Sequence, residues 1–168
     1  LYNQSKGKSI YPTPIVGMVG VHESLDHITP NYFQDQGDII FLVGQTEAEF
    51  GGSELQKMLD GEYRGKAPKI DLDVEAKRQK QLLKAIHEGV VQSATDLSEG
   101  GLAVALAESV FHGKGFGFDV RLQGDATTVL FSETQSRFLV TVKQEQKQAF
   151  TSIMEDAEEI GVVTADAQ

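Results

Sequence analysis

The sequence of 168 residues contains no cysteine and no tryptophan, and acidic side chains outnumber basic ones to give a formal net charge of −10. Without cysteine the chain cannot form disulfides, thiolate metal sites or a cysteine nucleophile, and it is compatible with a reducing compartment. The excess of negative charge argues against an electrostatic grip on nucleic acid or on an anionic lipid surface. We therefore expect neither nucleic acid nor a membrane among its partners.

Long hydrophobic runs are also missing. No uninterrupted apolar run approaches the ~20 residues that cross a bilayer, and no basic segment followed by an apolar one opens the chain. The hydrophobic and charged fractions, 40% and 24%, are those of an ordinary globular protein. We expect a cytoplasmic protein. Because the chain starts at Leu1 rather than Met, and residues 162–166 look like a strand with nothing after it to pair, we expect an excerpt of a longer polypeptide.

Hydrophobic patterning predicts an α/β (α+β) fold, with a single mixed sheet flanked by helices. Short apolar runs bounded by glycine or polar residues predict strands at 15–21, 38–44, 90–95, 118–122 and 137–142. Helical spacing and capping residues predict helices from Ser53 to about Leu59, from Asp71 or Asp73 to Gly89, from Leu102 to His112 and from Phe150 to Gly161. Residues 129–131 form a further apolar run.

The first polar motif, residues 96–101, lies between a predicted strand and a predicted helix. Its candidate binding residues are Asp96, Ser98, Glu99, Gly100 and Gly101. Amide groups at the start of a helix can hold a phosphate, and Asp96 and Glu99 are candidate ligands for Mg²⁺, which prefers carboxylates and water. The alternative is that Asp96 or Ser98 only caps the helix, with Glu99 favourable in its first turn.

The second polar motif separates the apolar run at 129–131 from the strand predicted at 137–142. Its candidates for binding a phosphorylated sugar or a nucleotide are Glu133, Thr134, Gln135, Ser136 and Arg137. Hydroxyl, amide and guanidinium donors beside a carboxylate suit such a ligand. The alternative is a solvated hairpin loop in which Glu133 and Arg137 pair at the surface.

The remaining candidates for chemistry are weaker. The four histidines, His22, His27, His87 and His112, are scattered without the spacing of metal ligands or a partner for a catalytic triad. Residues 113–117 are rich in glycine but lack the ending of a phosphate-binding P-loop. We assign no catalytic residue to this chain.

Residues 96–109, Asp-Leu-Ser-Glu-Gly-Gly-Leu-Ala-Val-Ala-Leu-Ala-Glu-Ser, resemble the large, synthetase subunit of phosphoribosylformylglycinamidine synthase near its C-terminus. Three other stretches agree in the same order, at 11–20, at 42–44 with 51–54, and at 131–137. The resemblance implies a fold of the aminoimidazole ribonucleotide synthetase superfamily. It assigns residues 1–36 to the end of a preceding N-terminal-type domain with its linker, and 37–168 to a second C-terminal-type domain. Whether that domain is truncated at its C-terminus stays open.

The resemblance also implies a function, that of an ATP-dependent ligase of purine biosynthesis. The whole enzyme would convert formylglycinamide ribonucleotide, glutamine and ATP to formylglycinamidine ribonucleotide, using ATP and Mg²⁺. Its partners would be the remaining domains of the subunit, a glutaminase subunit and a small accessory subunit. The general base and most metal ligands belong to other domains, so the excerpt alone should be inactive, and no cofactor is assigned to it.

Two alternatives stay open. The chain could be a non-catalytic docking module of that enzyme, or part of another ATP-using enzyme of the superfamily, of the small-molecule kinase or selenophosphate synthase type. Glu133-Thr134-Gln135 is the counterpart of a Glu-Ser-Gln substrate motif in the first repeat, with Thr in place of Ser. By this resemblance it marks a site that the second repeat either keeps or has lost.

Overall fold

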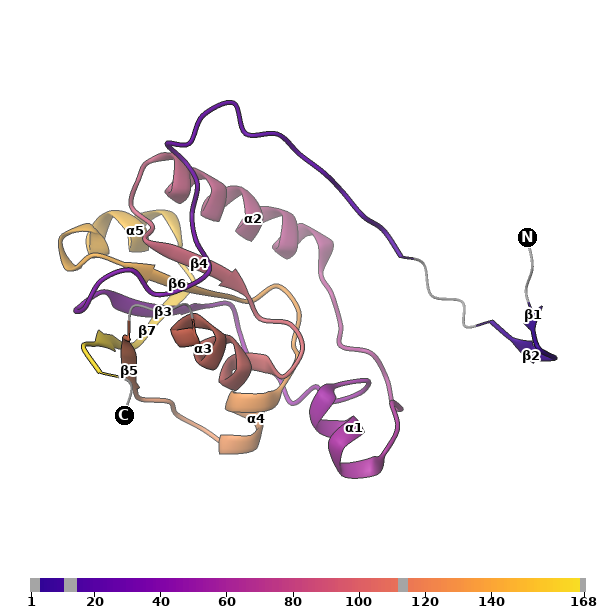
Figure 1. The fold of residues 1–168 in the computed structure, drawn as a ribbon. Coiled ribbons are helices and arrows are strands. Elements are labelled where there is room, and N and C mark those ends of the chain that lie inside the picture. Colours follow the sequence, from indigo (N-terminus) through magenta and orange to yellow (C-terminus); the bar gives the residue numbers. More distant parts are fainter. Residues whose placement is uncertain (1–3, 11–14, 112–114, 167–168) are drawn as a thin grey trace.

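The computed structural model describes residues 4–10, 15–111 and 115–166 (Figure 1). Its body is built on a five-stranded sheet with the strand order β4-β6-β3-β7-β5. The strands are β3 (Ile39–Val43), β4 (Ser93–Asp96), β5 (Gly117–Val120), β6 (Phe138–Val142) and β7 (Ala157–Thr164). The single sheet flanked by helices is confirmed. All pairings between these strands are antiparallel, so the sheet is not mixed in direction.

Helices cover both faces of the sheet. α3 (Gly101–Phe111) and α4 (Ala126–Phe131) lie against one face, and α2 (Leu72–His87) and α5 (Lys147–Ile153) lie against the other (Figure 1). A short 3-10 turn, η1 (Gln144–Gln146), leads into α5. The central strand β3 is therefore buried along its whole length. Its alternate side chains divide between two cores, which explains its unbroken run of apolar residues.

The remaining helix, α1 (Glu54–Asp60), stands beside the sheet rather than on it and buries none of its side chains (Figure 1). Its predicted N-cap is confirmed, because the side chain of Ser53 accepts a hydrogen bond from the amide of Gln56. For α2 the sequence left two caps open. The structure selects Asp71, which accepts from the amides of Asp73 and Val74. Among the described residues, no helix is long and apolar enough to cross a bilayer.

Residues 15–29 form an extended arm that leaves the body and runs outward, and beyond it lies a two-stranded ribbon of β1 (Gln4–Ser5) and β2 (Lys8–Ser9) (Figure 1). The strand predicted at 15–21 is wrong. Val19 is fully exposed and Ile15 is 96% exposed. A strand needs a neighbour to satisfy its backbone, and the described sheets place none beside this segment. The adjoining residues 11–14 of the resembling stretch lie outside the described residues.

The helix predicted from Phe150 to Gly161 is wrong in its second half. α5 ends at Ile153, and β7 begins at Ala157. Apolar residues in a short window fit a helical or a strand pattern, and here the pairing of β7 with β3 and β5 selects the strand. Residues 162–166 are likewise not an isolated strand, because β7 runs to Thr164 and pairs with both β3 and β5.

Residues 129–131 belong to a helix, so they do not form the first arm of a hairpin. The side chain of Asp125 caps α4 by accepting from the amide of Thr128 at 2.8 Å. Both polar motifs therefore make the same kind of connection. Each joins one helix to one of two neighbouring strands, β4 and β6.

Candidate functional site

The two polar motifs lie side by side. We call residues 96–101 the glycine turn and residues 132–137 the polar loop. β4 ends at Asp96, which pairs with Phe138 at the start of β6. One residue further, the amide of Leu97 donates to the carbonyl of Arg137 over 3.0 Å. The antiparallel register therefore brings together two motifs that are separate in the sequence.

A carboxylate of the chain itself occupies the position at which the glycine turn was expected to hold an anion. One carboxylate oxygen of Glu133 accepts from the amide of Gly100 at 2.8 Å and from the amide of Glu54, the first residue of α1, at 2.9 Å. Gly101 is closely packed against the polar loop, since a Cβ there would lie 2.5 Å from the carbonyl oxygen of Ser132. The polar loop thus joins the beginnings of α3 and α1.

Arg137 is buried inside the polar loop, with 1% of its surface exposed. Its guanidinium donates to the carbonyl oxygens of Thr134 at 3.0 Å and Ser132 at 2.6 Å, and to the hydroxyl of Thr46 at 3.0 Å. All three nitrogens of the guanidinium therefore hold the loop in shape. The guanidinium therefore has a structural role, because each of its nitrogens already donates a hydrogen bond within the protein.

The charge of Arg137 is only partly compensated. Burial lowers the pKa of Arg137 from its ordinary value to about 10, and the nearby carboxylates of Glu49 and Glu133 oppose that shift. The group stays protonated at neutral pH. The alternative of an exposed ion pair between Glu133 and Arg137 is wrong, because Arg137 is buried and the loop follows a helix instead of closing a hairpin.

The hydroxyl groups of the polar loop fasten it to the chain segment after β3. Ser132 donates to the carbonyl oxygen of Glu47 at 2.5 Å, and Thr134 accepts from the amide of Glu47 at 3.0 Å. The amide of Glu133 donates to the carbonyl of Glu49 at 3.2 Å. Three successive residues of the loop, 132–134, thus use hydrogen-bonding groups in contacts within the protein.

The polar side chains of the glycine turn have the opposite environment. Asp96, Ser98 and Glu99 are exposed, and so is Gln135 at the tip of the polar loop. Within the described ranges, no group of three or more histidine or acidic side chains is arranged to hold a metal ion. Asp96 and Glu99 therefore form, by themselves, an incomplete set of ligands for Mg²⁺.

A hollow of about 900 Å³ opens beside the polar loop. Thr134, Gln135 and Ser136 line one side, and the segment that leads into α2, with Lys69, lines the other. Ser136 has a φ of 62°, a left-handed conformation that costs on the order of 1–3 kcal/mol in a residue with a side chain. This hollow is large enough for a nucleotide-sized ligand.

Arg78 is a member of this site that the sequence reasoning missed. Its guanidinium donates to the carbonyl oxygen of Ser136 at 2.9 Å and to the carboxylate of Asp156 at 2.6 Å. The signal was present, because Arg78 lies one and two turns before the buried residues Leu82 and Ala85 of α2 and so shares their inward face.

The model of the family described as AIR synthase related protein, C-terminal domain, matches residues 35–168. The chain belongs to this family. The AIR synthase-related C-terminal domain therefore accounts for the whole sheet and for both polar motifs.

Solved structures share the fold of this AIR synthase-related domain. Thermotoga maritima PurL complexed with FGAR matches with a TM-score of 0.70 and 22% identity, over 83% of this chain and 26% of that one. T. maritima PurL complexed with ATP matches with a TM-score of 0.63 and 20% identity, over 84% and 24%. The hydrogenase maturation protein HypE in complex with ATP matches with a TM-score of 0.59 and 16% identity, over 84% and 47%. The chain thus spans about a quarter of the PurL chains it matches.

Proposed function

We propose that this chain is the second C-terminal-type domain of the large subunit of a phosphoribosylformylglycinamidine synthase. The observation that carries the proposal is the family membership over residues 35–168 together with the PurL fold over 83% of the chain. The order of the four resembling stretches adds support. The subunit would be an ATP-dependent carbon–nitrogen ligase of the cytoplasm that makes formylglycinamidine ribonucleotide from formylglycinamide ribonucleotide, glutamine and ATP.

Because the chain spans about a quarter of the PurL structures, the rest of the subunit would supply the catalytic machinery. On this proposal residues 1–36 end a preceding domain and residues 37–168 form the C-terminal-type domain. ATP and Mg²⁺ would be cofactors of the complete enzyme. Its protein partners would be a glutaminase subunit and a small accessory subunit, in line with a structure titled PurLQS from T. maritima among the matches.

Within this domain we assign two roles to the candidate residues. Glu133, Thr134 and Arg137 are positioning residues, since their polar atoms hold the chain segments of the site together. Asp96, Ser98 and Glu99 of the glycine turn, with Gln135 and Ser136 beside the hollow, are the residues left to face a phosphorylated ligand. Phosphoryl transfer relies on positioning and charge neutralisation, so the carboxylates of Asp96 and Glu99 would act through the Mg²⁺ of the complete enzyme and not on the phosphate directly.

The test is an assay of the full-length subunit, with its glutaminase partner, for ADP release that depends on glutamine and formylglycinamide ribonucleotide. We expect activity in the complete enzyme and none from the 168-residue chain. Asp96→Asn in the complete enzyme should lower kcat/KM while leaving the melting temperature unchanged. Turnover by the isolated chain would refute the proposal. So would a complete enzyme whose ADP release does not depend on formylglycinamide ribonucleotide.

The match to HypE favours one alternative, an ATP-using enzyme of the same superfamily with another acceptor. HypE in complex with ATP shares the fold, and this chain covers 47% of it, a larger share than for PurL. Profiling the full-length protein with ATP and a panel of small acceptors separates the two, because the synthase releases phosphate only with its own ribonucleotide substrate.

The internal contacts of the polar loop favour the other alternative, a domain that only docks and supports its neighbours. That role predicts that Asp96→Asn leaves kinetics per folded molecule unchanged in the complete enzyme. The assay with this variant therefore decides between a ligand-facing and a structural glycine turn.

A further inference from the structure

We propose that His27 and His87 bind one divalent transition-metal ion, of the Zn²⁺ class, which fastens the arm to the end of α2. The sequence shows no metal-binding spacing because the two residues are far apart along the chain. In the fold their ring centroids are 4.9 Å apart, with the ring planes inclined by 50°. His27 lies on the arm, and His87 is the last residue of α2.

The separation of the rings fits a shared metal ion. A zinc-bound imidazole nitrogen lies about 2.0–2.1 Å from the metal, so two rings on one tetrahedral ion have centroids roughly 5 Å apart. Both histidines are exposed, which leaves their nitrogens open to an ion from solvent. On this proposal the two rings turn so that one nitrogen of each faces the ion.

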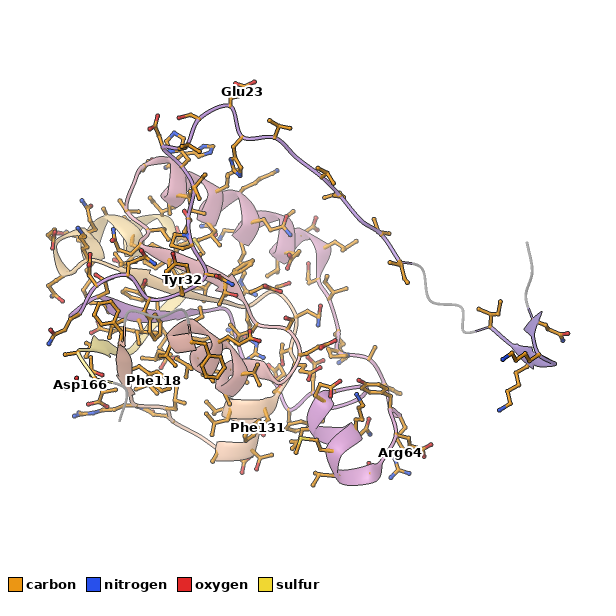
Figure 2. The ribbon with its side chains drawn as sticks, in the orientation of Figure 1. Glu23, Tyr32, Arg64, Phe118, Phe131 and Asp166 are labelled. Atoms are coloured by element: carbon orange, nitrogen blue, oxygen red, sulfur yellow. The ribbon has the colours of Figure 1, made fainter. Side chains whose placement is uncertain are left out.

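The surroundings leave room for the water that completes such a site. A hollow of about 570 Å³ is lined by both histidines, by His22 and Glu23 of the arm, and by Ile86 of α2. Figure 2 shows Glu23 at the bend of the arm, above the end of α2. The described residues hold no group of three potential ligands, so the site consists of two imidazoles and water.

Nearby charges permit a cation at this place. Glu23 on the arm lines the hollow, and on α2 the amine of Lys84 is paired with Glu88 at 3.7 Å. The carbonyl end of a helix also favours positive charge. Imidazole suits Zn²⁺, Ni²⁺ and Cu²⁺, whereas Mg²⁺ prefers oxygen ligands, so the site would be distinct from any magnesium requirement of the enzyme. The inference does not rest on the proposed ligase function.

Calorimetric titration of the 168-residue chain with zinc chloride tests the proposal. We expect one saturable site, no response to magnesium chloride, and an affinity at least about tenfold lower in His27→Gln and in His87→Gln. The matched control is His22→Gln, which removes an imidazole of the same hollow that lies outside the pair and should keep the parent affinity. Zinc binding that survives unchanged in the double variant, or no binding by the parent chain, would overturn the proposal.

A second readout locates the effect of the metal. Leu25 lies between the bend of the arm and His27 and is 80% exposed, so chymotrypsin can reach it. Zinc should slow cleavage after Leu25 in the parent chain but not in His87→Gln, whose change lies on α2, away from the cleavage site. Equal protection of both proteins would mean that the metal acts on the protease or elsewhere on the chain, and would also contradict the proposal.

Discussion

The glycine turn and the polar loop are both rich in polar residues and lie side by side, yet most of their polar side chains have opposite environments. In the glycine turn the side chains of Asp96, Ser98 and Glu99 are exposed, and the backbone makes the internal contacts. In the polar loop the side chains of Thr134 and Arg137 are buried and make the internal contacts themselves. Polar residues in a turn can therefore hold segments of the protein together or remain exposed to solvent.

The difference follows from what each segment must connect. The polar loop lies between α4, the central part of the sheet and the segment before α1, so its buried backbone groups need hydrogen-bond partners that water cannot supply. The glycine turn passes along the edge, where β4 is the outermost strand. Burial, rather than residue type, separates the polar side chains that hold the fold together from those that remain exposed.

The largest effect should come from Arg137, the centre of the polar loop. Arg137→Met keeps an unbranched apolar stem but is shorter and lacks the guanidinium, so the carbonyl oxygens of Ser132 and Thr134 lose their buried donor. We expect the free energy of unfolding to fall by about 3–5 kcal/mol, because two buried carbonyl oxygens lose their donor and each unsatisfied group costs roughly 1–3 kcal/mol. Urea denaturation measures it, and Arg137→Lys should recover part of the loss. A loss equal to that of an exposed substitution would contradict the structural role.

The next effect concerns the contact between the two motifs at Gly101, which has a φ of 65°. In Gly101→Ala the new methyl group would strike backbone oxygens, so we expect a loss of about 3 kcal/mol from strain and overpacking. Gly89→Ala is the matched control, since Gly89 also has a positive φ, 71°, but nothing lies within 4 Å of its Cβ position. Thermal unfolding of both variants separates the clash from the conformational cost, and equal losses would rule out the clash.

A smaller effect is expected at Glu133, whose carboxylate joins α3 to α1. Glu133→Ala leaves the amides of Gly100 and Glu54 without their acceptor and should cost about 2 kcal/mol. Exchange of both amide hydrogens, followed by NMR, should accelerate together in the variant. Gln135→Ala at the exposed tip of the same loop is the control and should change neither quantity. Acceleration at one amide alone would show that the carboxylate does not link the two helices.

The smallest effect on stability should appear in the glycine turn itself. Asp96→Ala and Glu99→Ala remove exposed side chains, so each should change the free energy of unfolding by less than about 0.5 kcal/mol. Chemical denaturation of the 168-residue chain checks this. A loss of 1 kcal/mol or more, on the order of a lost helix cap, would support the capping role that the sequence allows for Asp96 and would remove the contrast between the motifs.

The sequence predicted those parts of the fold that rest on local signals. Ser53 was identified as a cap, and the cap of α2 was narrowed to Asp71 or Asp73, because a short side-chain acceptor next to a helix acts on amides only a few residues away. The central strand β3 was predicted because a short apolar run bounded by glycines is typical of a buried strand. Local signals failed after Phe150, where a few apolar residues fitted the spacing of a helix as well as that of a strand. The pairing of β7 with β3 decided that the second half is a strand.

By itself the sequence determined the single sheet flanked by helices, both polar motifs and the resemblance that led to the family. Only the tertiary structure decided which polar side chains are exposed. It also decided that Glu133 accepts from amides at the beginnings of α3 and α1, and that the rings of His27 and His87 are in contact. The physical reason is one of range. Capping and periodicity act within a few residues, whereas burial and desolvation depend on contacts between segments that are distant along the chain.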